Sequence, residues 1–567
     1  MRRLLALVAL LAAGACAGLP TSGPIQQVGP DEPRVDAVVR YAPAPPVPGA
    51  EPQEVVRGFL DAMLAYPVST ATASAYLTPD AADAWQSSAG VRIYRAPEVG
   101  PPSVPAVTVD DGRPVAVEVE VREDAVLDET GHYRGTDRDV TETFVLEPVD
   151  GEWRIANPPV GRMVTAAYFA SYFRVFDSFF FDARGAQLVA DPVHVAVGEQ
   201  LATGLMASLT AGPPTALAGE LRTYLPDPEA WQPSVTVDAE GVAEVEFDVD
   251  GSSLDAGIRN RWSAQVVRTL AQVPEVEGVR IITATGPLAV GGGSVQDLGA
   301  WLRFDPPEPR GRPGAVVDGR VVRLVDDAAE PVPGPRGDDA GGATVVAVSE
   351  DAIAVSAGGD IGVAFAGDPE VVVPAEDVVS LVWDPTGVLW VADRPGGALR
   401  IRLVTAEAVR DVQVAPLGTV TSFALDPGAR RYAVTTAGES PQVLVGLVQR
   451  DQRSGVTGIG PGRVVAPDAA APAAVVWTGA SSLAFLADSS AGRQVFTSRI
   501  DGSPAVGGAF GAVPRLPDVG ARRLAIDVGS APSWYVTDDR DRLWHLRAGG
   551  SWRLLGLLDV TALGSGR

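Results

Sequence analysis

The residue with the clearest chemical role is Cys16, the single cysteine of the 567-residue chain. A pair of arginines comes first, an apolar run over residues 4–13 follows, and small residues at 13–15 precede the thiol. An apolar run of about ten residues is typical of a signal-peptide core and is too short to span a bilayer. The pattern predicts a bacterial lipoprotein signal, with cleavage before Cys16 and a thioether-linked lipid on its sulfur. One position departs from the pattern, because Leu is usual where this chain has Ala13.

The alternative is an ordinary secretory signal with a chance cysteine, but Cys16 lies at the position that lipidation requires. Each buried methylene of an acyl chain adds roughly 0.8 kcal/mol of membrane affinity, so two or three chains anchor a protein firmly. Residues 1–15 are therefore predicted to be a signal peptide, and the mature chain to be tethered to the outer face of the cytoplasmic membrane. No later apolar run reaches about eighteen residues, so no second membrane segment is expected.

The other residues with catalytic or metal-binding potential are scattered. His132, His194 and His545 lie in three different predicted domains, so they share no cluster unless those domains dock unexpectedly. His132 follows a glycine in a loop and is interpreted as a surface histidine. The acidic run 538–541 lacks EF-hand spacing and is interpreted as a turn, and the glycines at 291–293 as a hinge. With no HExxH, CxxC or GxSxG motif, the sequence predicts no catalytic residue, no metal site and no cofactor.

Composition excludes some classes of partner. The chain has 71 acidic and 45 basic residues, a net charge of -26, which argues against nucleic acid and against lying flat on an anionic membrane. Its length suggests about three or four domains. Residues 16–50 are rich in proline, glycine and alanine and predict an extended stalk after the lipid.

The first folded unit is expected over residues 51–185. Apolar residues at helical spacing predict a helix over 52–64, with shorter helices near 69–76 and after Thr78. From Val91 onward, valines alternate with polar residues, which predicts long strands. Helices followed by a meander of strands favour a curved sheet wrapped on helices, as in NTF2-like cones.

Aromatic residues are concentrated over residues 163–181, at the end of this first unit. They could form a membrane or nucleic-acid surface. Aromatic side chains bury large areas, however, so packing at a junction between two domains is favoured.

The second unit is expected over residues 190–290. Its predicted order is helix, strand, strand, helix, strand, at 201–209, 234–237, 242–249, 261–272 and 278–282. This order implies a small sheet with helices on one face.

The third unit is expected over residues 300–567. A strand–turn–strand pattern recurs at 379–393, 420–434, 474–488 and 523–538, and an earlier copy begins near Thr344. The spacing is about 35–55 residues, which is the size of a propeller blade. A β-propeller of about five or six blades is therefore favoured over a sandwich. Residues 552–560 are expected to close the ring against 316–325.

Two stretches of this sequence resemble known proteins. The run from Leu205 through Gly212 and Pro213 to Pro226, followed by residues 264–270, resembles a GerMN domain. The stalk opening, Cys-Ala-Gly-Leu-Pro-Thr-Ser-Gly-Pro over 16–24, resembles the LpqB family of actinobacterial lipoproteins. The order of lipidation signal, stalk, NTF2-like unit, GerMN unit and propeller covers nearly the whole chain and is more specific than any single motif. The predicted fold class is thus multi-domain, with two small α+β domains followed by an all-β propeller.

The resemblance implies a non-enzymatic lipoprotein on the extracytoplasmic face of the cell membrane. It would bind the extracytoplasmic part of the sensor kinase MtrB and modulate the MtrA–MtrB two-component system, which affects cell-wall homeostasis and division. The residues alone leave two other classes open. A glycan-binding or glycan-processing propeller would have two channel carboxylates about 5–10 Å apart. A ligand carrier would have an apolar cavity of a few hundred Å³ in the cone.

Overall fold

The structure is a computed structural model in which residues Tyr41–Arg567 form one compact unit. It describes residues 40–102, 112–214, 217, 219–226, 234–288, 290, 293–305, 311–451, 453, 455–503, 513–528, 532–547, 549–557, 559–564 and 566. Cys16, the predicted signal peptide and most of the predicted stalk lie outside these residues. Two of the glycines of the predicted hinge, Gly291 and Gly292, lie outside them as well.

The first domain begins with three helices, α2 (Pro52–Ala62), α3 (Ala71–Ser74) and α4 (Pro79–Ala84). Local sequence explains where two of them start. At α2, Glu51 and Glu54 form a reciprocal capping box, and proline occupies the first helical turn, where its missing N–H costs nothing. At α4, the Thr78 hydroxyl accepts a hydrogen bond from the Ala81 amide. The expected helices are confirmed.

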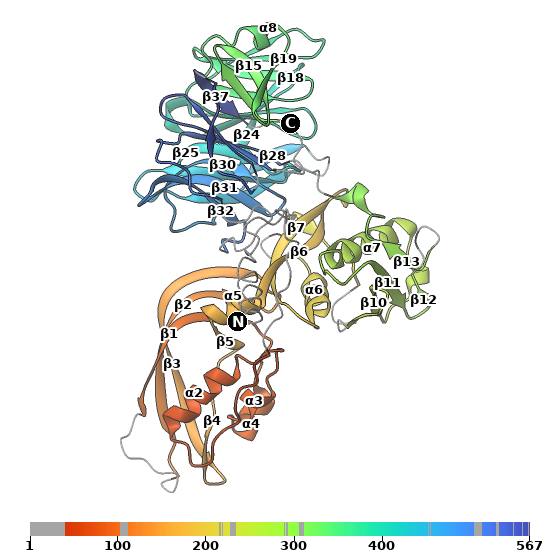
Figure 1. The fold of residues 1–567 in the computed structure, drawn as a ribbon. Helices are drawn as coiled ribbons and strands as arrows, with labels where there is room; N and C mark the ends of the chain where they lie inside the picture. The colour runs from red at the N-terminus through yellow and green to blue at the C-terminus, as the bar shows by residue number, and fades with distance from the viewer. Residues whose placement is uncertain are drawn as a thin grey trace, which may run out of the picture. The chain divides into compact units, whose positions relative to one another are not determined.

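Five strands complete this domain in the order β4-β3-β2-β1-β5. They are β1 (Val91–Pro102), β2 (Val115–Leu127), β3 (Tyr133–Val149), β4 (Glu152–Ile155) and β5 (Arg162–Thr165). Along β2, burial alternates, so that Val117 and Val119 are fully buried between polar neighbours. The long strands curve around α2 (Figure 1), as the alternation predicted.

The second domain starts directly after α5 (Ala166–Tyr172), with the hairpin of β6 (Phe173–Asp182) and β7 (Leu188–Ala196). The short strand β8 (Leu221–Arg222) pairs with β6. Phe179, Phe180 and Phe181 of β6 belong to the core of this domain. The expected limit of the first unit at residue 185 therefore falls within a hairpin of the second.

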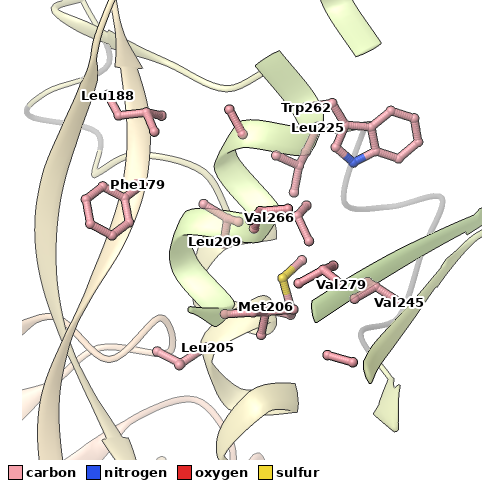
Figure 2. Packing of buried hydrophobic residues seen from close by; sticks show 14 of the residues in the cluster. Phe179, Leu188, Leu205, Met206, Leu209, Leu225, Val245, Trp262, Val266 and Val279 are labelled. Atoms are coloured by element: carbon pink, nitrogen blue, oxygen red, sulfur yellow. The ribbon is translucent and has the colours of Figure 1, made fainter. Parts of the chain in front are cut away.

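Two helices, α6 (Leu201–Thr210) and α7 (Ala256–Leu270), pack with a second sheet of β9 (Val235–Val237), β10 (Val242–Phe247), β11 (Gly278–Thr283), β12 (Gly286–Pro287) and β13 (Val295–Asp297). Strands β10 and β11 are parallel and are joined through α7. Figure 2 shows residues of both helices, among them Met206 and Val266, between the two sheets. Helix α7 begins five residues earlier than expected because the Asp255 carboxylate caps the amides of Gly257 and Ile258.

The third domain is a propeller of six blades among the described residues, so the expectation of five or six is confirmed. Blade 1 comprises β14 (Gly314–Val317), β15 (Arg320–Val325), β16 (Ala328–Pro331) and β37 (Val560–Gly564). Blade 2 comprises β17 (Val345–Val348), β18 (Ala352–Ala357), β19 (Asp360–Phe365) and β20 (Val371–Pro374). Blade 3 comprises β21 (Val378–Trp383), β22 (Leu389–Asp393), β23 (Arg400–Val404) and β24 (Val409–Val414).

Blade 4 comprises β25 (Thr419–Leu425), β26 (Arg431–Ala437), β27 (Val443–Arg450), β28 (Val456–Ile459) and β29 (Arg463–Val464). Blade 5 comprises β30 (Ala470–Trp477), β31 (Ser482–Ser489) and β32 (Gly492–Arg499). Blade 6 comprises β33 (Arg523–Asp527), β34 (Ser533–Thr537), β35 (Leu543–Arg547) and β36 (Arg553–Leu554).

The ring closes through β37, which pairs with β14. The prediction that residues 552–560 close the ring was wrong for all of them except Val560, the first residue of β37. Arg553 and Leu554 form the outer strand of blade 6 instead. Both segments are rich in apolar residues, WRLLGLLD over 552–559 and VTALG over 560–564, so apolar content alone did not separate them.

Two turns of the propeller have the same pattern of hydrogen bonds around an aspartate. After β21, the Asp384 carboxylate accepts hydrogen bonds from the amides of Thr386 and Val388 and from the indole of Trp390. In blade 6, Asp538 accepts from two amides and from the indole of Trp544 in the same spacing. The acidic run 538–541 is therefore a structural turn.

None of the helices in the described ranges has the length and apolar character that crossing a bilayer requires.

Candidate functional site

His132 lies in the turn between β2 and β3, and the structure corrects its interpretation as a surface histidine. Its side chain is only 18% exposed, and its Nε2 is 2.7 Å from Oδ2 of Asp191 on β7. Burial alone would lower the pKa of His132, but hydrogen bonds and charge from Asp128 and Asp191 outweigh it and raise the pKa to about 9. His132 is therefore a cation held between two carboxylates, at the contact between the first and second domains.

His194 on β7 lies at the same junction. It is buried, and its Nε2 is 3.0 Å from Oδ2 of Asp501 in the propeller. The ring of Tyr133, next to His132, lies 5.3 Å from the ring of His194. Docking thus brings two of the three histidines close together, although each has its own carboxylate partner. His545 is elsewhere, with Nδ1 2.7 Å from Oδ1 of Asp327.

Charges of opposite sign face each other where the second domain meets the propeller. Arg430 is 2.5 Å from Asp182 of β6, and the neighbouring Arg431 donates a hydrogen bond of 2.7 Å to the carbonyl of Ala190. Arg430 ends the turn before β26 and Arg431 is the first residue of that strand, and nothing in their local sequence marks them as interface residues. Partners 241 or more residues away supply the contacts, as for His194 with Asp501, so sequence spacing could not reveal them.

The aromatic stretch packs at the junction of the first two domains, as predicted. Tyr172 of α5 stacks on Tyr66 with ring centroids 4.4 Å apart, and Phe169 lies 5.3 Å from His194. The hydroxyl of Tyr66 also donates to the carbonyl of Val197. These rings join the domains, and their burial explains the local concentration of aromatic residues.

The cone of the first domain is filled by its own side chains. Phe59 of α2 packs on Phe144 of β3 with ring centroids 6.0 Å apart, and both are fully buried. A cavity of about 960 Å³ borders the cone, but charged residues of all three domains line part of it, including Arg92, Glu123 and Arg463. It is not the apolar cavity within the cone that a ligand carrier would need.

The propeller encloses a second cavity, of about 450 Å³, along its central channel. One strand of each blade contributes to its lining: β17, β21, β25, β30, β33 and β37. Most lining side chains are aliphatic. The hydroxyls of Ser380 and Ser422 face neighbouring blades and accept hydrogen bonds from the amides of Phe423 and Val475, at 3.0 and 3.1 Å.

Asp426 is the carboxylate among the described lining residues of this channel. Both of its oxygens accept backbone amides of its own turn, from Gly428, Arg430 and Arg431. A second carboxylate facing it is not among those lining residues. The described channel therefore does not meet the criterion of paired carboxylates that would favour glycoside chemistry. Groups of three or more His, Cys, Asp or Glu side chains suited to a metal are likewise absent from the described ranges.

The fold and the residues that line the central channel define the class of protein: two α+β domains followed by a six-bladed propeller, whose channel is lined mainly by aliphatic residues. Three family models match successive parts of the chain. They are "Lipoprotein LpqB, N-terminal domain" over residues 45–170, "Sporulation and spore germination" over 177–284 and "Lipoprotein LpqB beta-propeller domain" over 319–561. The chain belongs to the LpqB family of lipoproteins.

Relatives named lipoprotein LpqB support this assignment. That of Streptomyces avermitilis is 26% identical and is matched over 97% of both chains. That of Cutibacterium acnes is 32% identical over 51% of this chain, a match that spans 47% of the relative. Among solved structures, TolB from Acinetobacter baumannii matches with a TM-score of 0.34 and 12% identity, over 55% of this chain and 86% of that one. A likeness this low adds nothing to the fold described above.

Proposed function

We propose that the chain is a lipid-anchored regulator on the extracytoplasmic face of the cell membrane. It would bind the extracytoplasmic domain of the sensor kinase MtrB and modulate MtrA–MtrB signalling. The lipid would be carried by Cys16. The observation that carries this proposal is the succession of family models, which places all three domains of an LpqB lipoprotein in order along one chain.

The architecture supports action by binding. Buried contacts join the three domains, including His132 with Asp191 and His194 with Asp501. These contacts hold the domains against one another, so that all three could present a binding surface to one partner. The net charge of -26 gives the surface a long-range field, so partner association would depend on salt.

The test is binding of the full chain, purified in detergent, to the isolated extracytoplasmic domain of the kinase at two salt concentrations. Saturable binding that is absent with an unrelated lipoprotein supports the proposal. Weaker binding at higher salt would assign part of the affinity to charge. No binding at high micromolar concentration would refute the kinase as partner.

The anchor has a separate test. Cys16→Ala should move the protein from the membrane fraction to the soluble extracytoplasmic fraction, or leave it as uncleaved precursor. Metabolic labelling with a palmitate analogue should be lost with the same substitution. Labelling that persists in Cys16→Ala would exclude this residue as the lipidation site.

A further inference from the structure

Two adjacent arginines at the central channel have a feature that the proposed function does not use. Arg523 is the first residue of β33 and is partly buried, and the exposed Arg522 directly precedes it; both line the 450 Å³ cavity. The Nη1 atom of Arg523 is buried and has no hydrogen-bond partner. Within the described part of the chain, neither guanidinium forms an ion pair with a carboxylate.

This arrangement is unusual for such an acidic chain. Burial lowers the pKa of Arg523, while the charge of Asp541 opposes this effect and that of Arg522 adds to it. A buried guanidinium nitrogen without a partner is costly, because its desolvation is not repaid by a hydrogen bond. Acidic residues outnumber basic ones by 71 to 45, so the lack of a partner does not reflect a shortage of carboxylates.

The rest of the lining limits what could occupy the cavity. Its walls are largely aliphatic, with Val379 and Val382 from β21 and Val476 from β30. The one lining carboxylate, Asp426, is occupied by amides of its own turn, as described above. Among the described lining residues, the two arginines are therefore the charged groups left to hold a ligand.

We propose that the central channel binds a ligand with a carboxylate at one end and a small aliphatic body, with Arg522 and Arg523 holding the carboxylate. The planar guanidinium fork matches the geometry of a carboxylate. Two cations with one nearby anion, Asp541, suit a ligand of single negative charge. The cavity volume lies within the range of about 300–1,000 Å³ that is typical of small-ligand sites. This site is independent of the kinase proposal.

The same chemistry could come from a free small acid or from the carboxyl terminus of a peptide. Calorimetric titration of the full chain in detergent distinguishes them with three probes: acetyl-Val-Ala-Val with a free carboxylate, its carboxyl-terminal amide, and butyrate. The free-acid peptide should bind saturably, and the affinity of the amide should be lower by about tenfold or more. Competition by butyrate identifies free acids as a sufficient ligand, whereas its failure to compete identifies a chain terminus.

Arg523→Gln should lower the affinity for the free-acid peptide by about tenfold and leave the affinity for the amide unchanged. Arg410→Gln, which removes an exposed arginine on β24 of the same domain, is the charge-matched control and should have no effect. The comparison of acid with amide on the unmodified chain remains decisive if Arg523→Gln does not fold.

Three results would overturn the proposal. One is equal affinity for acid and amide. Another is the absence of saturation by any probe up to about 10 mM. The third is an unchanged affinity of Arg523→Gln for the free-acid peptide in a variant that folds normally.

Discussion

Two arginines of the propeller, the buried Arg402 in blade 3 and the partly buried Arg523 in blade 6, differ in how their charge is matched. Arg402 places Nη2 3.0 Å from Oδ2 of Asp393 and donates from Nη1 to the carbonyl of Pro374. Arg400 binds the same aspartate at 2.6 Å. Arg523 has no such carboxylate, and its Nη1 lacks any hydrogen bond. Burial lowers the pKa of both guanidinium groups.

The difference teaches how to separate a structural charge from one available to a ligand. The Asp393 carboxylate is fully buried and binds two cations, so the charge of Arg402 is matched within blade 3, although the Nε atom of Arg402 also lacks a hydrogen-bond partner. The blade 6 arginine borders a cavity and is incomplete. Buried polar groups are normally satisfied, so an unsatisfied one beside a cavity marks a binding position.

The largest expected effect is on the blade 3 network. Asp393→Ala should destabilise the propeller by about 3–5 kcal/mol, because it leaves the buried Arg402 without a counter-charge. Urea unfolding of the full chain measures it. Asp368→Ala, which removes an exposed carboxylate of blade 2, is the matched control. A loss below about 1 kcal/mol would show that Arg402 does not depend on Asp393.

The aspartate turns of blades 3 and 6 should contribute similarly through their indole hydrogen bonds, and Asp538 has an additional ion pair with Arg542 at 2.7 Å. Asp384→Ala removes the acceptor for the Trp390 indole in blade 3, and Asp538→Ala does the same for Trp544 in blade 6. Each should cost about 2–3 kcal/mol, since a buried donor is left unpaired. Similar shifts of the urea midpoint would confine the difference between the blades to their arginines. A large inequality would mean that blade 6 is looser as a whole.

His132 resembles Arg402 because it is a cation bound by carboxylate, but His132 loses its charge within the accessible pH range. Its pKa of about 9 lies above the ordinary 6.5, so its contribution is fully present below about pH 6.5 and is lost as the pH rises through about 9. Stability should fall by on the order of 3 kcal/mol over this window, at about 1.4 kcal/mol per pKa unit. Unfolding midpoints measured against pH should lose this slope in His132→Gln. An unchanged slope in the variant would assign the titration to another group.

The smallest effect is expected for Arg523→Gln without ligand. Because Arg523 has no partner to lose, stability should change by less than about 1 kcal/mol. The urea midpoint of this variant, compared with that of Asp393→Ala, is the direct test of the contrast. A loss as large as that of Asp393→Ala would show that Arg523 is structural after all.

Much of the fold was predictable because its signals are local. The valine alternation of β2, the proline and threonine at the start of α4 and the repeated turns of the propeller all lie within a few residues of the structure that they specify. The start of α7 was missed, although Asp255 is a normal helix cap. The closing strand was misplaced because two neighbouring segments are both rich in apolar residues.

The functional positions were less predictable because they depend on distant partners. His132 was expected at the surface, but its acceptor Asp191 lies 59 residues away, and the acceptor of His194 lies 307 residues away. Arg523 is one of 45 basic residues in the chain, and only the channel wall gives it a role. Charge pairs that form through domain docking leave no spacing signal in the sequence.

The pairing of β37 with β14 also sets the order of assembly. The two strands are separated by almost the whole propeller sequence, so the edge of β14 stays unpaired until residues 560–564 have been made. Contacts between such distant segments form slowly, because a long loop must close first. The central channel is thus completed only when β37 is in place, and a chain shortened before Val560 would leave the edge of β14 without a partner.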